Sequence, residues 1–249
     1  YIKLEKNNKE LKELNEFRSN LIDTVSHEFG TPLTSIQGYT SRLLRQDIQI
    51  DEATKQKSLK VIKRQAERLK RMVEDLLVIP DIEGATLNVN IEEVSIPEIV
   101  EDSLMLVKNN EGKFLVNNVS DDIPLIMADR DRFEQVMINL VENAIKYADD
   151  NSDVIVENDE TYDINNNEYV KIVVKNKCPI IPKDKLKILF DKFTRLDDST
   201  TRTTRGTGLG LFIVKGLVET MGGHIQLHSG MDWGFEVHLF MRKVASKNE

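Results

Sequence analysis

The feature that most constrains this chain is an apolar repeat typical of a long helix. The repeat consists of Leu59, Ile62, Ala66, Leu69, Val73 and Leu76. Spacings of three and four residues place one apolar side chain on the same helix face at every turn. Such a helix needs another helix to cover that face. The repeat therefore predicts helix packing in this part of the chain.

A second apolar series precedes the repeat. It consists of Leu11, Leu14, Phe17, Leu21 and Val25. Residues 1–79 contain only two glycines and one proline, which favours helix throughout, and Pro80 is expected to end the second helix. Two helices make a hairpin, which cannot bury both stripes alone. A homodimer that forms a four-helix bundle and an intramolecular coiled-coil stalk both remain open.

The composition changes after Pro80. Strands are predicted at Thr86–Ile91, Val154–Glu157, Tyr169–Lys175, His224–His228 and Phe235–Met241. Helices are predicted to begin near Pro97, near Asp129, near Lys183 and after Gly210. This order indicates an α+β two-layer sandwich. We therefore expect a helical hairpin over residues 1–82 and a mixed domain over residues 83–249.

Charge and composition exclude several classes of protein. A net charge of −8 disfavours binding to nucleic acid. One cysteine, Cys178, allows neither an internal disulfide nor a multi-thiolate zinc site. No apolar run is long enough to span a membrane. We expect a cytoplasmic chain, and because Tyr1 falls inside a predicted helix, any sensor or membrane anchor would lie upstream.

The first helix carries a histidine in a polar setting. His27 lies about 120° around the helix from the stripe of Leu14 and Leu21, so its ring should face solvent. Glu28 is placed to hydrogen-bond one ring nitrogen and leave the other nucleophilic. Thr31 lies one turn further along, where Pro32 should bend the helix. A lone exposed histidine is more often an ordinary surface residue.

Two further patterns suggest a phosphate ligand. Asn139, Asn143 and Lys146 share one polar face of a helix, where amide oxygens suit Mg²⁺ and the amine suits phosphate; a merely solvated face is the alternative. Residues 206–210, Gly-Thr-Gly-Leu-Gly, lie at the start of an apolar helix, which favours an anion. The polar stretch Asp191–Arg205 before them is expected to be a mobile lid, in which Lys192, Arg195, Arg202 or Arg205 closes over a triphosphate. An ordinary surface loop is the alternative.

Together these motifs resemble the transmitter core of sensor histidine kinases, over essentially the whole chain. The resemblance rests on an ordered set: Ser-His-Glu-x-x-Thr-Pro-Leu-Thr, Asn-Leu-x-x-Asn-Ala-x-Lys-Tyr, Gly-Thr-Gly-Leu-Gly-Leu and Gly-Gly-His-Ile. Leu189–Phe193 is similar to the family's phenylalanine box. The resemblance implies a phosphotransfer hairpin followed by a Bergerat-type ATP-binding domain.

The resemblance also implies roles for individual residues. His27 would accept the phosphoryl group, Glu28 would orient or deprotonate its ring, and Thr31 would help position water for dephosphorylation of the partner. Asn139 and Asn143 would bind Mg²⁺. The ATP contacts would come from Asn139, Asn143, Lys146, Tyr147, Asn176, Arg195, Arg205, Gly206, Thr207, Gly208, Leu209 and Gly210. A response regulator receiver domain would take the phosphoryl group onto an aspartate.

Two departures from the family pattern stand out. Asn176 replaces the aspartate that accepts a hydrogen bond from adenine, and both glycines of that box are missing. Phe29-Gly30 replaces the usual Leu-Arg, which removes a positive charge near His27. The leading hypothesis is an autophosphorylating protein-histidine kinase. The alternatives are a pseudokinase dimer scaffold and an ATPase of the gyrase or chaperone type. His224, His228 and His238 are interpreted as structural.

Overall fold

The computed structural model describes residues 22, 25–45, 50–107, 113–164, 167–194 and 207–245. The chain forms two compact bodies, and the division falls inside helix α2, between Leu77 and Val78. The predicted domain boundary between residues 82 and 83 stays a prediction.

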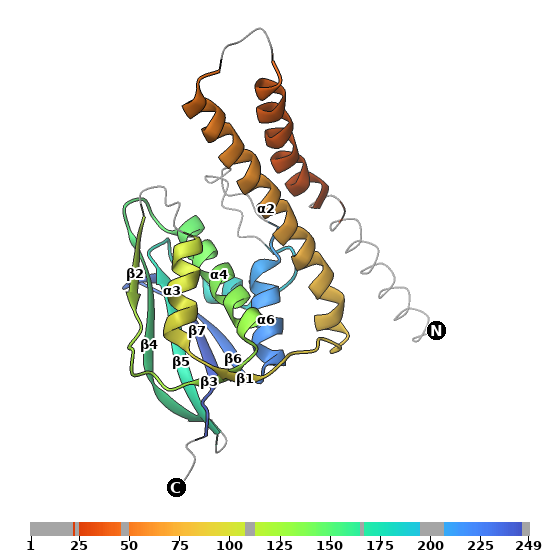
Figure 1. The fold of residues 1–249 in the computed structure, drawn as a ribbon. Helices are drawn as coiled ribbons and strands as arrows, with labels where there is room; N and C mark the ends of the chain where they lie inside the picture. Colours follow the sequence, from red (N-terminus) through yellow and green to blue (C-terminus); the bar gives the residue numbers. More distant parts are fainter. Residues whose placement is uncertain are drawn as a thin grey trace. The chain divides into compact units, whose positions relative to one another are not determined.

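The first body is a helical hairpin, as predicted (Figure 1). Its first helix covers residues 25–43 of the described part, and the second is α2, Glu52–Glu83. Asp51 caps α2, because its carboxylate accepts hydrogen bonds from the Thr54 backbone N–H at 2.8 Å and from the Thr54 hydroxyl at 2.6 Å. These bonds lower the pKa of Asp51. Leu11, Leu14, Phe17 and Leu21 lie outside the described residues.

The apolar repeat of α2 is only partly covered within one chain. Ile62, Leu69 and Leu76 are half-buried, whereas Leu59 is 44% exposed and Val73 is 43% exposed. Leu77, one turn beyond Val73, is 69% exposed. One hairpin therefore leaves part of the stripe open, as the sequence predicted.

The prediction that Pro80 ends α2 is wrong, because the helix continues to Glu83. Pro80 lacks the N–H that would bond one turn back. Val78 and Ile79 are buried in the second body. Ile82 packs directly against Gly216, because a Cβ atom on Gly216 would lie only 2.5 Å from Cγ2 of Ile82. We attribute the extra turn to this packing, which offsets the lost hydrogen bond.

The second body is an α/β sandwich, in agreement with the predicted fold class. Its helices are α3 (Ile96–Leu106), α4 (Arg130–Tyr147), α5 (Lys183–Ile188) and α6 (Gly210–Thr220). Its strands are β1 (Glu92–Val94), β2 (Phe114–Asn118), β3 (Ile126–Ala128), β4 (Asp153–Ile164), β5 (Asn167–Asn176), β6 (His224–Gly230) and β7 (Gly234–Arg242). The main sheet has the order β2-β4-β5-β7-β6, in which only β2 and β4 are parallel neighbours.

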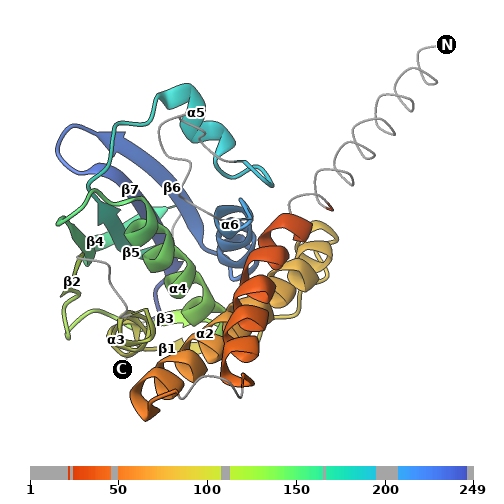
Figure 2. The same cartoon turned by 90° about the horizontal axis from the view of Figure 1, so that it is seen from above.

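Helices α3, α4 and α6 cover one face of this sheet (Figure 2). The largest fully buried side chains include Phe133, Met137, Leu140, Ile172, Ile213, Leu217, Leu239 and Met241. These residues come from α4, α6, β5 and β7. The core therefore fixes the relative positions of α4 and α6, the two helices that carry the polar motifs.

Four predicted strands are confirmed and one is wrong. β4, β5, β6 and β7 lie where the alternation predicted them, although β4 runs on to Ile164. Thr86–Ile91 is not a strand. Within it, the Asn90 backbone N–H donates to the Asp129 carboxylate at 2.8 Å, and pairing with β3 begins only at Glu92. The short strands β2 and β3 were not predicted.

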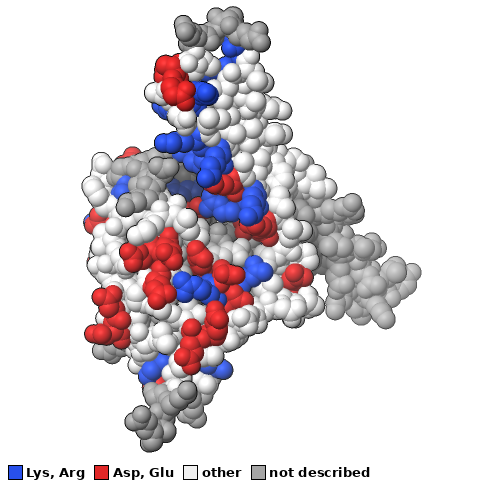
Figure 3. Space-filling model, in the orientation of Figure 1, with Lys and Arg blue, Asp and Glu red and all other residues white. Residues whose placement is uncertain are grey.

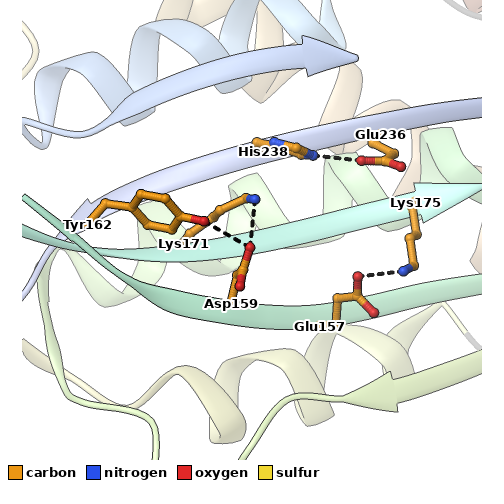
Figure 4. A network of polar contacts seen from close by, with 7 residues as sticks. All are labelled: Glu157, Asp159, Tyr162, Lys171, Lys175, Glu236 and His238. Carbon is orange, nitrogen blue, oxygen red and sulfur yellow. Dashed lines mark hydrogen bonds and ion pairs between the residues drawn. The ribbon is translucent and has the colours of Figure 1, made fainter. Parts of the chain in front are cut away.

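The sheet face opposite the helices carries its own polar network (Figure 4). Asp159 accepts hydrogen bonds from the Tyr162 hydroxyl at 3.0 Å and from the Lys171 amine at 2.9 Å. Lys175 pairs with Glu157 at 2.5 Å. Beneath these long side chains, Tyr169, Val173, Ile155 and Phe240 are buried. The network thus covers an apolar layer that would otherwise be open to water.

His238 is a titratable residue on this face of the sheet. Its Nε2 lies 2.7 Å from the Glu236 carboxylate, and its ring stacks on that of His228 with centroids 4.2 Å apart. Burial lowers the pKa of His238 below its ordinary value of 6.5; Lys171 and His228 act in the same direction, and the hydrogen bond to Glu236 opposes them. The folded state therefore favours the neutral ring.

We predict that the second body loses stability as the pH falls below 6.5, because the unfolded chain then binds a proton that the folded His238 resists. Hydrogen exchange of β6 and β7 at about pH 7.5 and about pH 5.5 measures this loss. His238→Gln should reduce the difference between the two pH values, and His224→Gln should not. An unchanged difference in His238→Gln would contradict the assignment.

Candidate active site

His27 presents its imidazole to solvent, as predicted. Its side chain is 77% exposed, on a helix whose neighbouring residue Glu28 is only 3% exposed. The Nδ1 atom of His27 lies 3.8 Å from Oε1 of Glu28. The carboxylate therefore lies on the Nδ1 side of the ring and leaves Nε2 clear of it.

Glu28 is held from the second helix of the hairpin. The Arg68 guanidinium donates through Nη2 to Oε2 of Glu28 at 3.2 Å, and the Arg68 side chain is 31% exposed. A carboxylate this deeply buried needs a partner, because its desolvation would otherwise be unfavourable by several kcal/mol. Arg68 therefore fixes the carboxylate beside His27. Arg68 was not predicted, because a contact between residues 40 positions apart leaves no local pattern in the sequence.

Thr31 and Pro32 complete the local geometry of the histidine helix. Thr31 is half-buried one turn after His27, and Pro32 is buried. The Thr34 hydroxyl donates to the backbone carbonyl of Gly30 at 2.7 Å. The described helix runs on through Pro32 to residue 43. Thr31 thus lies on the same helix as His27.

In the second body, α4 places the predicted polar residues along one stripe. Asn139 and Asn143 are half-buried, and the Lys146 amine donates to the Tyr147 hydroxyl at 2.8 Å. The buried Nδ2 atom of Asn139 has no hydrogen-bond partner among the described residues. An amide nitrogen is a donor, so this atom lacks an acceptor such as a phosphate oxygen or a water.

The glycine-rich turn lies against this stripe. A Cβ on Gly210, the first residue of α6, would stand 3.2 Å from the Asn143 amide nitrogen. Gly208 has φ of +70°, and a Cβ there would meet the Phe193 backbone at 2.7 Å. The Phe193 N–H donates to the Gly208 carbonyl at 3.0 Å. Glycine is therefore required at position 208, beside the phenylalanine box, and a side chain at position 210 would crowd Asn143 of α4.

Lys192, which the sequence suggested as a phosphate contact, has another partner in this structure. Its amine pairs with the carboxylate of Glu83 in the last turn of α2 and lies 5.1 Å from the centroid of the Phe212 ring. Burial lowers the pKa of Lys192. This ion pair links the phenylalanine box to the end of α2, a contact that the sequence did not predict.

Asn176 lies at the end of β5, in the box that departs from the family. It is 1% exposed, and its Nδ2 lies 3.4 Å from the Lys177 carbonyl. Gly234, with φ of +78°, packs against the Cys178 backbone, so a side chain there would collide with this box. Burial raises the pKa of the Cys178 thiol, which argues against a reactive thiolate.

Arg195, Arg205 and Gly206 lie outside the described residues. Thr207 and Leu209 flank Gly208, and Leu209 is fully buried. The structure therefore brings together Asn143, Gly210, Gly208 and the phenylalanine box within the second body.

Comparison with known proteins identifies the family. Residues 17–85 match the His Kinase A (phospho-acceptor) domain, and residues 128–245 match the histidine kinase-, DNA gyrase B- and HSP90-like ATPase family. The chain carries a histidine kinase transmitter core. The hairpin and the α/β body correspond to the two parts of that core.

Curated relatives agree with the assignment of this transmitter core. Hybrid signal transduction histidine kinase D of Dictyostelium discoideum is 30% identical over 99% of this chain, and the alignment covers 17% of that protein. Sensor protein SrrB of Staphylococcus aureus is 30% identical over 89% of this chain and 37% of its own length. The chain thus spans well under half of the relatives that it matches.

Solved structures share the fold of the transmitter core. Full-length ShkA in complex with AMPPNP superposes with a TM-score of 0.61 at 24% identity, covering 90% of this chain and 46% of that chain. ThkA in complex with the response regulator protein TrrA gives a TM-score of 0.57 at 22% identity, covering 96% of this chain and 65% of that chain.

We predict that Arg68→Gln destabilises the hairpin by about 1–3 kcal/mol, because it leaves the buried Glu28 carboxylate without its cation. Arg64→Gln is the matched control, because Arg64 is exposed one turn away. Amide hydrogen exchange in residues 25–43 measures the change. Equal protection in the two variants would contradict the assigned role of Arg68.

Proposed function

We propose that this chain autophosphorylates His27 with ATP and passes the phosphoryl group to an aspartate of a response regulator. The observation that carries the proposal is an exposed imidazole beside a buried carboxylate that an arginine holds in place. A surface histidine without a role does not need a buried, ion-paired neighbour. Nothing in the described residues or in the relatives favours a scaffold that has lost nucleotide binding.

The chemistry follows from the position of Glu28. A proton on Nδ1 of His27 is directed toward the Glu28 carboxylate, which leaves the Nε2 lone pair free to attack. Nε2 forms a bond to the γ-phosphorus as the bond between that phosphorus and the ADP oxygen breaks. The ring then becomes cationic, and Glu28 accepts the Nδ1 proton. Arg68 acts as a positioning residue, because it holds the carboxylate that takes this proton.

The polar stripe of α4 fits a magnesium nucleotide. Asn139 and Asn143 offer amide oxygens that suit Mg²⁺. The unsatisfied Nδ2 donor of Asn139 would take an acceptor, such as a phosphate oxygen. Mg²⁺, when bound there, would neutralise charge on the phosphates. Gly208 and Gly210 leave backbone room for those phosphates, and Lys146 with Tyr147 lies on the same stripe. We assign adenine contact to Asn176, whose amide oxygen is a suitable acceptor.

Phosphotransfer needs a partner that carries an acceptor aspartate. ThkA was solved in complex with a response regulator protein, and we propose the same class of partner for this chain. Thr31, on the helix face one turn from His27, is placed to position water when the partner is dephosphorylated. Because this chemistry uses cellular ATP, we propose that the chain acts in the cytoplasm. Among the described helices, none combines the length and the apolar character of a membrane span.

The open part of the α2 stripe supports a homodimer. Leu59, Ala66, Val73 and Leu77 are exposed and lie on one side of the helix. A second hairpin that packs on this side would bury them and complete a four-helix bundle. We propose this arrangement for the hairpin.

The direct test is labelling with γ-³²P-ATP and Mg²⁺. We predict an acid-labile, alkali-stable label that His27→Gln abolishes and that His224→Gln retains, because His224 lies on the sheet of the other body. An acid-stable label, or a label that survives His27→Gln, would overturn the proposal.

A second prediction concerns the magnesium nucleotide. Asn143→Ala should weaken ATP binding on the order of 10-fold in Mg²⁺ and have little effect in EDTA, because it removes a metal ligand. Asn88→Ala, at an exposed position outside the stripe, serves as the control. Calorimetric titration gives both dissociation constants. Equal losses with and without Mg²⁺ would refute a metal-binding role for Asn143.

A further inference from the structure

Helix α2 carries a concentration of positive charge that the proposed reaction does not use. Residues 52–71 contain eight basic and two acidic side chains, a net charge of +6 in a chain whose total is −8. Figure 3 shows Lys and Arg side chains gathered along this helix. Such an asymmetry on one element points to an anionic partner.

Six of the eight basic side chains of α2 fall into two sets with different surroundings. Lys55, Lys63 and Lys70 pair with Glu52, Glu67 and Glu74, at 3.6, 3.8 and 3.6 Å. Lys57, Lys60 and Arg64 are exposed and have no acidic partner among the described residues. At 100° per residue these three lie within about 60° of one another on the helix. We call them the basic stripe.

The basic stripe runs along α2 toward the level of His27, the proposed phosphoacceptor. Arg68 continues it by one turn and holds Glu28, whose carboxylate adjoins the His27 ring. The stripe is distinct from the open apolar side of α2, because Leu59 and Val73 lie more than about 100° around the helix from it. The cations are therefore available to a partner that approaches His27 and not to the second hairpin of a dimer.

We infer that the basic stripe docks the acidic face of the domain that receives the phosphoryl group. This inference rests on the proposed function. An aspartate that accepts a phosphoryl group needs a divalent cation to neutralise the charge, and that cation needs further carboxylates as ligands. The accepting face is therefore acidic. Lys57, Lys60 and Arg64 complement that charge beside the donor histidine and accelerate encounter by electrostatic attraction.

The test compares two triple variants that change the net charge equally. One is Lys57→Glu, Lys60→Glu and Arg64→Glu, which reverses the basic stripe. The matched control is Lys55→Glu, Lys63→Glu and Lys70→Glu, on the ion-paired side. Circular dichroism checks that both remain helical, and the corresponding Gln triples provide a milder version. The probe is the isolated receiver domain that the unmodified chain labels fastest from a panel at equal concentration.

We expect the stripe variant to autophosphorylate His27 at the unmodified rate and to lose at least about 10-fold in kcat/KM for transfer. The control should lose less than about 2-fold. Transfer by the unmodified chain should also slow with added NaCl, and the stripe variant should lose that dependence.

Three results would overturn the inference. The first is equal transfer by the stripe and control variants. The second is a loss of ATP affinity and autophosphorylation in the stripe variant, which would assign the stripe to the nucleotide. The third is the absence of transfer to any receiver from a chain that labels His27. A chain that never labels His27 would instead refute the proposed function itself.

Discussion

The ion pair between Glu28 and Arg68 is the interaction on which this account of the hairpin depends. It joins the two helices at the level of His27 and places a buried carboxylate on one side of that exposed ring. Without the cation, a charged carboxylate at this depth would be unfavourable by several kcal/mol and would turn outward. The geometry of His27 is thus a consequence of hairpin packing as well as of the local motif.

In the second body, packing brings backbone groups and side-chain amides close together. Gly210 approaches the Asn143 amide, and Gly208 approaches the Phe193 backbone, at distances that leave little room for a side chain. The rigid core between α4 and α6 maintains both approaches. Polar atoms that converge in this way suit a phosphate ligand better than an apolar one.

Periodicity predicted most of the fold, and its failures have physical causes. The alternation in β4 to β7 and the repeat in α2 are long enough to specify their elements. Thr86–Ile91 alternates equally well but lacks a strand to pair with, because β3 pairs only from Glu92. Pro80 failed to end α2, and we trace this to the buried contacts of Val78 and Ile79. Tertiary packing overrode local preference in both segments.

The sequence motifs indicated the individual residues of the candidate site but not the contacts that join them. The motifs indicated His27, Glu28, the α4 stripe and the glycine turn, since each is local in sequence. Arg68 and the pair between Lys192 and Glu83 join distant segments, and no spacing rule reveals such pairs. The basic stripe could not be predicted from the sequence either, because the sequence does not reveal which of the neighbouring cations have acidic partners.

The central claim is that Glu28 engages Nδ1 of His27 and leaves Nε2 to form the bond to phosphorus. Long-range ¹H–¹⁵N NMR on phosphorylated protein labelled with ¹⁵N-histidine tests this claim directly. We predict that phosphorus coupling falls on Nε2 of His27 and that Nδ1 shows none. Coupling on Nδ1, or on any other histidine, would contradict the account.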